Sequence, residues 1–470
     1  MIKGFKSLGT VEESKDGVML LSGFGSVSYG EKITCTKRGV SAMVINLGRD
    51  KVGAVLFGEV QSVSAGDTFT STGEIMSVPA SYDMVGRVLD GLAYPIDGKN
   101  TNFKKVKMMP VEKIAAGVME RQGVDTPLET GIISVDSMIP VGRGQRELVI
   151  GDRGTGKTAF TLDAIINQKD AKNRPICIYV AIGQKRSQVA NIIDKLEKFH
   201  AMEYTIIISA TASDSVALQY LAPYSATAIA EYFLADKKDV LIVYDDLTKH
   251  AWAYRQMSLI LERPPGREAY PGDIFYLHSR LLERSCRLND KLGGGSITSF
   301  PIVETQLGDV SAYIPTNIIS ITDGQIYFET DLFNSGFRPA IDPGNSVSRV
   351  GSAAQTKEMK KIAGRMRLDL AQFKELEAFA QFGSADLDEA TRNKIERGRR
   401  VREILKQPQY SPLPTYLQIA VIYAANEGYF DKIDLENVLD VKYKLADYLM
   451  KEKNKDITQG VEKFFKLNSL

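Results

Sequence analysis

The stretch "GDRGTGKT" at residues 151–158 decides the fold of the central part of this chain. It fits the pattern G-x-x-x-x-G-K-[ST], a glycine-rich loop whose backbone N–H groups surround nucleotide phosphates. The apolar run "RELVI" (146–150) predicts a strand before the loop, and "AFTLDAIINQ" (159–168) predicts a helix after it. This strand–loop–helix context is what the motif requires, so a chance glycine-rich turn is the weaker interpretation.

The chemistry of the loop predicts which atoms meet the nucleotide. We expect Gly151 and Gly156 to let the backbone approach the phosphates, and Lys157 to place its charge between the β- and γ-phosphates. The Thr158 hydroxyl is a candidate ligand of Mg²⁺. The predicted cofactors are therefore ATP or ADP with Mg²⁺. The candidate nucleotide-binding residues are those of the whole loop: Gly151, Asp152, Arg153, Gly154, Thr155, Gly156, Lys157 and Thr158.

A second apolar run, "DVLIVYDD" (239–246), ends in two acids. An acid at the end of a buried strand beside such a loop can hold Mg²⁺ directly or through water, and Asp245 is the favoured ligand with Asp246 as its neighbour. Without the loop, an acidic pair in this position is more often a turn or a helix cap. The upstream loop favours the metal interpretation.

Hydrolysis requires a group that positions the attacking water. The first candidate is Gln184 in "AIGQKRS" (181–187), at the end of the next predicted strand, where a carboxylate would face the γ-phosphate. An amide cannot take up the proton, although a glutamine orients water in some GTPases. The residues by themselves leave open whether the chain hydrolyses the nucleotide that it binds.

Three domains are predicted from the patterns on either side of this region. Short β-rich runs with close turns predict an N-terminal antiparallel β-barrel over residues 1–78. Apolar strands that alternate with helical stretches predict a mostly parallel α/β domain over 79–355. Helical periodicity rich in Lys, Glu, Leu and Ala predicts a helical bundle over 356–470, so the fold class is multidomain α/β.

Composition excludes several classes of protein. Lys+Arg 59 against Asp+Glu 58 gives a net charge of +1, so no global charge attracts nucleic acid or anionic lipid. The three cysteines and three histidines lie far apart, which predicts neither a disulfide framework nor a zinc site and is typical of a reducing compartment. We expect no membrane span and no targeting peptide, because no sufficiently long apolar run is present.

Several blocks in order resemble one family, the non-catalytic alpha subunit of the F-type ATP synthase. The match runs through "VGRGQRELVIGDRGTGKTA" (141–159), "CIYVAIGQKRS" (177–187), "SVSRVGSAAQ" (346–355) and "LKQPQYSPLP" (405–414). The resemblance implies the same domain order, with a RecA-like nucleotide-binding domain at the centre. It also implies an alternating hexamer with beta subunits, a central-stalk gamma subunit, and ATP synthesis or hydrolysis coupled to ion transport.

The resemblance implies a specific role for two residues. The catalytic beta subunit of the family has a glutamate as its water-activating base where the alpha subunit has glutamine, so Gln184 marks a chain that binds Mg-ATP and keeps it. Arg349 matches the arginine finger that reaches the γ-phosphate in the neighbouring beta site, an interaction worth about 10³–10⁵ in rate in comparable enzymes. On residue type alone, a surface ion pair is an equally good interpretation of Arg349.

Other implied positions lie outside the loop. Gln407 and Gln409 match the segment that lines the adenine, and Phe333 and Arg338 match residues next to the nucleotide. Residues 263–273 resemble the loop that contacts the central shaft. The family also implies a location on an energy-transducing membrane through the complex, at the bacterial cytoplasmic face or inside an organelle.

The sequence departs from the family at two points. Gly154 stands where the alpha subunit has glutamine, which removes a side chain from the phosphate loop. The sequence also begins close to the first barrel strand, without the extension that contacts the peripheral-stalk subunit in the family, which leaves open whether a peripheral-stalk subunit is a partner. This leaves open a divergent head complex that is not coupled to an ordinary ion-translocating sector.

Two other functions compete with this interpretation. One is a self-sufficient homohexameric ATPase of the export or translocase type. Gln184 disfavours it, and residues 1–78 have little of the basic and aromatic clustering that binds single-stranded nucleic acid. The other is a structural protein with a vestigial loop, which the intact Lys157, Thr158 and Asp245 disfavour.

Overall fold

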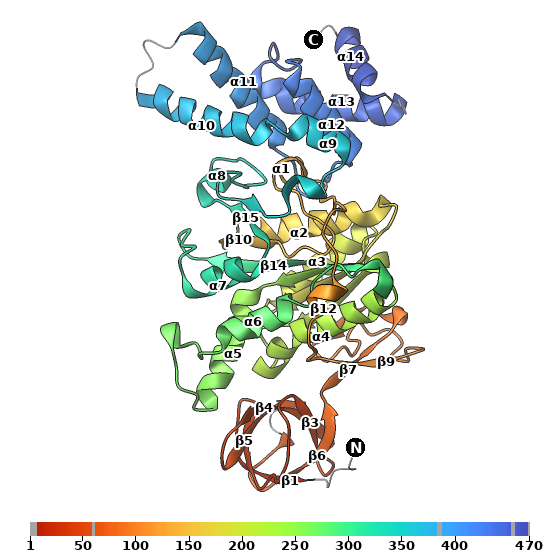
Figure 1. Ribbon diagram of the computed structural model, residues 1–470, viewed down its shortest axis with the longest axis vertical. Coiled ribbons are helices and arrows are strands. Elements are labelled where there is room, and N and C mark those ends of the chain that lie inside the picture. Colours follow the sequence, from red (N-terminus) through yellow and green to blue (C-terminus); the bar gives the residue numbers. More distant parts are fainter. Residues whose placement is uncertain (1–6, 59–61, 383–387, 453–455, 469–470) are drawn as a thin grey trace.

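The computed structural model describes residues 7–58, 62–382, 388–452 and 456–468. The three predicted regions follow one another along the long axis of the molecule, with the barrel at one end and the C-terminal helices at the other (Figure 1). The outer ends of the first and last predicted domains, residues 1–6 and 469–470, lie outside the described residues. The central sheet therefore lies between the N-terminal barrel and the C-terminal helices (Figure 1).

The N-terminal region is a closed antiparallel barrel, as the sequence predicted. Its strands are β1 (Leu8–Lys15), β2 (Val18–Ser22), β3 (Glu31–Cys35), β4 (Val40–Leu47), β5 (Lys51–Phe57) and β6 (Thr68–Ile75), and they pair in the order β1-β2-β5-β4-β3-β6. Alternate residues point inward and form a small core that includes Val11, Leu21, Ile33 and Phe69.

Two short strand pairings connect the barrel to the centre. Strand β7 (Ser77–Ala80) pairs with β9 (Lys107–Pro110), and β8 (Val88–Asp90) joins the edge of the central sheet beside β12. The boundary predicted after Val78 lies within β7.

The central sheet has the strand order β16-β15-β10-β14-β13-β11-β12-β8. Its main strands are β10 (Leu148–Asp152), β11 (Ile176–Ile182), β12 (Thr205–Ala210), β13 (Asp239–Asp245), β14 (Ser296–Thr305) and β15 (Gly324–Phe328), which are parallel, whereas the short β16 (Val347–Ser348) is antiparallel to β15. Because parallel strands end at the same edge, the loops after β10, β11 and β13 meet there.

Helices pack against this sheet and continue into the C-terminal layer. The central helices are α1 (Ile133–Met138), α2 (Lys157–Ile166), α3 (Arg186–Lys198), α4 (Val216–Ala235), α5 (Leu247–Ile260), α6 (Ile274–Leu282), α7 (Tyr313–Ile321) and α8 (Thr330–Asn334). The C-terminal helices are α9 (Lys357–Ala363), α10 (Met366–Phe382), α11 (Glu389–Leu405), α12 (Thr415–Asn426), α13 (Val438–Glu452) and α14 (Ile457–Leu467). One continuous apolar core joins Phe160 of α2 to Ile404 and Leu417 of the helical layer, so this layer is packed onto the nucleotide-binding domain.

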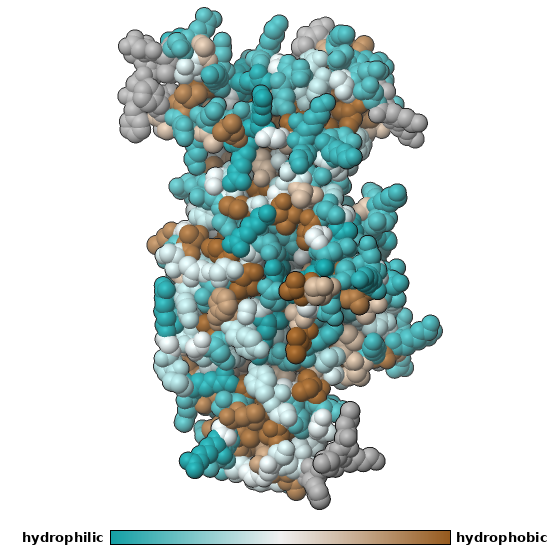
Figure 2. All heavy atoms as spheres, viewed as in Figure 1, coloured by the Kyte–Doolittle hydropathy of each residue, from teal (hydrophilic) through white to brown (hydrophobic). Residues whose placement is uncertain are grey.

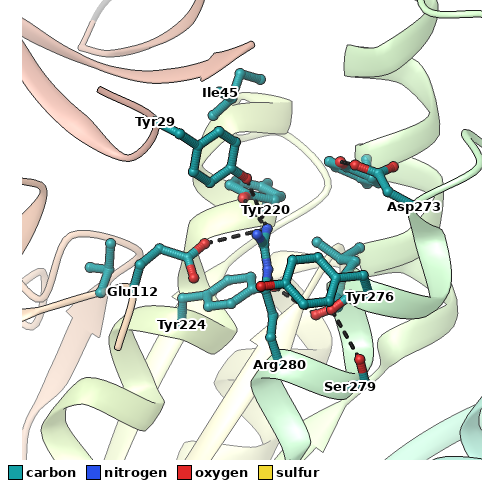
Figure 3. Close-up of polar contacts among 12 residues, drawn as sticks. Tyr29, Ile45, Glu112, Tyr220, Tyr224, Asp273, Tyr276, Ser279 and Arg280 are labelled. Atoms are coloured by element: carbon teal, nitrogen blue, oxygen red, sulfur yellow. Dashed lines mark hydrogen bonds and ion pairs between the residues drawn. The ribbon is translucent and has the colours of Figure 1, made fainter. Parts of the chain in front are cut away.

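A half-buried arginine links the barrel to the central domain (Figure 3). Arg280 of α6 donates hydrogen bonds to the hydroxyl groups of Tyr224 at 3.0 Å, Tyr29 at 3.0 Å and Tyr220 at 3.2 Å. Its Nη2 atom also lies 3.3 Å from a carboxylate oxygen of Glu112. Tyr29 belongs to the barrel, so a single guanidinium connects both domains and the segment between them.

Hydrophobic side chains are scattered among hydrophilic ones over the face drawn in Figure 2. Within the described ranges, the structure has no helix with the length and apolar character needed to cross a membrane.

Candidate functional site: a phosphate loop and an adjoining cavity

The phosphate loop connects the end of β10 to the start of α2. A Cβ atom on Gly151 would lie 2.3 Å from the carbonyl oxygen of Phe328 on β15, so only glycine fits at this point. Gly156 has a φ of 105° and directly precedes Lys157, the first residue of α2. The N-terminus of a ten-residue helix therefore faces the loop, an arrangement that favours bound anions.

The Lys157 ammonium group lies inside the loop. It donates hydrogen bonds to the carbonyl oxygens of Gly151 at 2.7 Å and Asp152 at 2.6 Å, and the residue is only 5% exposed. Burial lowers the pKa of Lys157, whereas the carboxylates of Glu304, Asp246 and Asp245 act in the opposite direction. The loop thus positions one cation where phosphate oxygens would be held.

Thr158 and Asp245 meet at the carboxyl edge of the sheet. The Thr158 hydroxyl donates a 2.8 Å hydrogen bond to Oδ2 of Asp245, and the hydroxyl of Tyr179 donates to the same oxygen. Burial raises the pKa of Tyr179 well above its usual value, which keeps this phenol protonated as a donor. A hydroxyl next to a carboxylate at this position is the pair that holds Mg²⁺ in phosphate-loop proteins.

The donor set fits Mg²⁺ rather than a softer metal. The described part of the chain contains no group of three or more His, Cys, Asp or Glu side chains that could enclose a metal ion. Magnesium usually takes only one or two protein oxygens and completes its shell with phosphate oxygens and water. Thr158 and Asp245 together supply two such protein oxygens.

The two consecutive acids have separate tasks. Asp246 is the N-cap of α5 and accepts a 2.8 Å hydrogen bond from the backbone N–H of Lys249. Its carboxylate also forms an ion pair with the Lys249 ammonium group. Burial raises the pKa of Asp246 to about 6. The cap interpretation of this pair therefore applies to Asp246, and Asp245 alone stays the candidate metal ligand.

Gln184 lies beside Asp245, at the end of β11. Its Nε2 atom donates a 3.1 Å hydrogen bond to the backbone carbonyl of Asp245, and the residue is 6% exposed. The structure thus brings the amide to the acid–hydroxyl pair.

A cavity adjoins the loop and collects residues that are far apart in the sequence. The predicted residues among its lining are Thr155, Gly156, Phe333, Arg338, Gln407 and Gln409. The Arg338 guanidinium lies 4.3 Å from the ring centroid of Phe333, which keeps this pair together at one wall. Residues of the central nucleotide-binding domain and of the helical layer therefore line the same cavity.

The two glutamines of the cavity differ. Gln407 is buried and its amide is occupied by the protein: Oε1 accepts from the N–H of Ile133 at 2.7 Å, and Nε2 donates to the carbonyl of Gly131 at 2.9 Å. Gln407 thus forms a fixed wall and ties the helical layer to α1. Gln409 is exposed and lines the same cavity.

The remaining loop residues support or border the site. The Asp152 carboxylate accepts hydrogen bonds from the hydroxyls of Thr305 at 2.6 Å and Thr330 at 2.9 Å, which fasten the loop to neighbouring segments. Arg153 and Gly154 are exposed. Gly154 has a φ of 83°, and a Cβ atom there would meet open space.

Arg349 lies near the beginnings of the parallel strands β10 and β15, at the opposite end from the phosphate loop. It directly follows β16, is exposed, and donates its backbone N–H to the carbonyl of Asp323 at 2.8 Å, next to the start of β15. Strand β15 runs parallel to β10, whose far end forms the phosphate loop. A five-residue strand spans about 16 Å, so the structure does not bring Arg349 to the loop of its own chain.

Sequence reasoning missed several cavity residues, which are mostly apolar: Ile132, Ala159, Phe160, Phe328, Pro339, Ala340 and the acid Asp163. It also missed Tyr179, the second donor to Asp245. Phe160 and Asp163 lie on α2 directly after the loop, and their helical spacing from Gly156 is the signal that could have placed them on the cavity side.

Sequence profiles of one family match three segments of the chain. They describe the β-barrel domain of the ATP synthase alpha/beta family over residues 6–73, its nucleotide-binding domain over 131–348, and the C-terminal domain of the ATP synthase alpha/beta chain over 355–469.

Individual relatives match over nearly the whole chain. The chain is 56% identical over 443 residues to an ATP synthase subunit alpha of Dehalococcoides mccartyi, which covers 94% of this chain and 87% of the relative. It is 55% identical over 457 residues to that of Syntrophomonas wolfei and 54% identical over 469 residues to that of Cupriavidus metallidurans, each covering 97% of this chain and 90% of the relative.

Proposed function

Since this chain belongs to the ATP synthase alpha/beta family, we propose that it holds Mg-ATP without turning it over and lends Arg349 to the catalytic site of a neighbouring beta subunit. Its function is that of the family's alpha subunits: it is a nucleotide-binding, non-catalytic subunit of the F-type ATP synthase head. We propose in addition which residues of this chain perform that function.

One observation carries the proposal: the side chain beside Asp245 is an amide. Gln184 donates to the Asp245 carbonyl and is nearly buried. A carboxylate in this position could accept a proton from water, and an amide has no such capacity at neutral pH. The loop, the cation of Lys157 and the Thr158–Asp245 pair supply binding, so retention of nucleotide without turnover is the expected result.

Mg²⁺ would be held by Thr158 and Asp245. When bound, the ion neutralises charge on the β- and γ-phosphates. The protein's own part is to keep the two oxygens together through the hydrogen bond between them and the second donation from Tyr179.

The position of Arg349 supports a role in another subunit. The side chain is exposed, and the strand geometry separates it from the phosphate loop of the same chain. A cation serves phosphoryl transfer only where it reaches the transferring group, so a partner site must supply that phosphate.

A group of exposed apolar side chains also supports the proposal that this chain has partner subunits. Ile114, Val118 and Met119 are 92%, 89% and 88% exposed, and they occur within six residues of one another. Such a group is typical of a surface that another chain covers. We propose beta subunits as the alternating partners and a gamma subunit at the centre, with residues 263–273 as the segment that faces it. Association with the membrane would come through the complex.

The test is steady-state ATP hydrolysis by the purified chain at saturating Mg-ATP, with bound nucleotide quantified on the same sample. Bound nucleotide without turnover is the expected result, and Lys157→Ala should abolish the binding. The exposed Lys169→Ala is the matched control and should bind as the wild type does. Rapid turnover by the chain alone would contradict the proposal and indicate a self-sufficient ATPase.

A further inference from the structure

Glu147 carries a buried carboxyl group at the end of the sheet where the parallel strands begin, which is also where Arg349 lies. It directly precedes β10 and is 0% exposed. Its backbone N–H donates to the carbonyl of Ser299 on β14 at 3.0 Å. Among the described residues, its Oε1 atom has no hydrogen-bond partner. A buried polar atom without a partner is costly, so a functional reason for it is worth seeking.

The carboxyl group lies against the strand pair that carries the arginine. A Cβ atom on Gly324 would be 2.7 Å from Oε2 and 2.9 Å from Oε1 of Glu147. Gly324 is paired with Ser348 in the β15–β16 ladder, and Ser348 is the residue before Arg349. Only glycine at position 324 leaves room for this contact.

A hydrogen-bond chain runs from Glu147 to the residue before the arginine. Gln145 uses its Nε2 atom twice, donating to Oε2 of Glu147 at 2.7 Å and to Oγ of Ser348 at 3.1 Å. The Ser348 hydroxyl in turn donates to the carbonyl of Pro140 at 2.7 Å. Each link fixes the next, so the carboxyl orients the amide, and the amide fixes the hydroxyl of Ser348.

Electrostatics also couples the two groups. Burial raises the pKa of Glu147 well above its usual value, the carboxylate of Asp323 acts in the same direction, and the Arg349 guanidinium acts against it. The buried carboxyl and the exposed guanidinium are thus within electrostatic reach of each other.

We propose that Glu147 is a positioning residue for Arg349: through Gln145 and Ser348 it fixes the base of the segment that presents the guanidinium to the neighbouring subunit. The inference rests on the proposed function, because it assumes that Arg349 acts in a partner's site. Glu147 itself touches no reacting atom. Its effect comes from the accuracy with which Arg349 is placed, and a displacement of about 1 Å costs about a hundredfold in rate in comparable sites.

The experiment uses hexamers assembled from this chain and beta subunits, with kcat and KM for ATP hydrolysis measured separately. Glu147→Leu removes the acceptor for Gln145 and should lower kcat about 10- to 100-fold with KM little changed. Glu147→Gln keeps an acceptor oxygen of the same size and should restore most of the rate. Ser348→Ala removes the other end of the chain and should lower kcat in the same direction, which keeps the test valid if Glu147→Leu fails to assemble.

A double-mutant cycle separates positioning from general damage. In hexamers that carry Arg349→Ala, adding Glu147→Leu should cause no further loss, because the arginine that it positions is gone. An equal loss in both backgrounds would overturn the inference. If Arg349→Ala alone leaves kcat unchanged, the proposed function fails. If Arg349→Ala lowers kcat while Glu147→Leu and Ser348→Ala do not, only the positioning role of Glu147 fails.

Discussion

The Nδ1 atom of His250 on α5 lies 3.2 Å from the Nε2 atom of His278 on α6, and both rings are fully buried. The Nε2 atom of His250 lies 3.0 Å from the carbonyl oxygen of Tyr220, which can only accept. Nε2 of His250 therefore carries a proton, and when both rings are neutral Nδ1 of His250 accepts from Nε2–H of His278. This pair joins the helices on either side of the 263–273 segment.

The histidine pair should make the central domain sensitive to acid. Burial lowers the pKa of His250 to about 4 and that of His278 well below its usual value. Between about pH 6.5 and pH 4 the unfolded chain binds protons that the folded chain does not, so the unfolding free energy falls as the pH drops, by up to about 1.4 kcal/mol per pH unit for each ring.

Urea unfolding at several pH values measures this slope. The single tryptophan, Trp252, lies on α5 two residues from His250, so its fluorescence reports the relevant domain. Replacing both buried rings with glutamine should flatten the slope, whereas His200→Gln, at an exposed position, should leave it as in the wild type. Equal slopes in all three proteins would contradict the prediction.

Asp245→Asn should separate nucleotide binding from metal binding. The asparagine keeps an acceptor for Thr158 but loses the charge that Mg²⁺ requires, so ATP affinity in Mg²⁺ should fall about tenfold or more. Affinity measured in EDTA should change little. Equilibrium dialysis under both conditions checks this, with Thr158→Ser, which retains the hydroxyl, as the control. A loss of similar size with and without Mg²⁺ would indicate a structural role instead.

Arg349→Ala should have no effect on the chain alone and a large effect in the hexamer. The residue is at the opposite edge of the sheet from the loop, so the Kd of the purified chain for Mg-ATP should be unchanged. Assembled with beta subunits, the variant should lose about 10³-fold or more in kcat. Arg338→Ala is the matched comparison, because it removes a cation from the cavity wall and should weaken binding by the chain alone.

Gly154→Gln introduces the glutamine that the family resemblance led us to expect in this loop. Space is available, but the φ of 83° is unfavourable for a residue with a Cβ atom, by about 1–2 kcal/mol. We expect a decrease of a few degrees in Tm and retained ATP binding, measured by thermal unfolding and dialysis. Binding lost altogether would mean that the glycine conformation itself is needed at the phosphate.

Arg280→Met should loosen the barrel from the central domain. The substitution leaves Glu112, whose pKa burial raises, without its nearest cation, and removes three tyrosine contacts, so we expect a loss of about 2 kcal/mol or more. Limited proteolysis of the segment between the domains should become faster. Arg267 is exposed, and Arg267→Met removes one positive charge just as Arg280→Met does, so this control variant should be cleaved at the wild-type rate.

The fold was predictable because its signals are local. The pattern around Lys157 contains a strand, a loop and a helix within about twenty residues, and the prediction of a barrel, an α/β centre and a helical layer was confirmed. The roles of Gln184, Arg349 and the other site residues stay predictions, although the structure brings the loop, Asp245 and Gln184 together.

What the sequence could not indicate depends on burial and on contacts between distant segments. Glu147 appears as an ordinary charged residue at the start of a strand, and only the tertiary structure places Gly324 and Gln145 against it. The tasks of Asp245 and Asp246 could not be separated either, because consecutive residues at a strand end differ only in which neighbours they meet.

Strand β10 has at its two ends the two regions on which the proposed function rests. One end adjoins Glu147 and the segment that carries Arg349, and the other end becomes the loop around Gly151, only four residues later. Strand β10 is hydrogen-bonded on both sides, to β14 and to β15, so a shift of one of its ends is constrained to carry the other end with it. If Arg349 acts in a neighbouring subunit as proposed, the phosphate loop and the base of that arginine share one supporting strand.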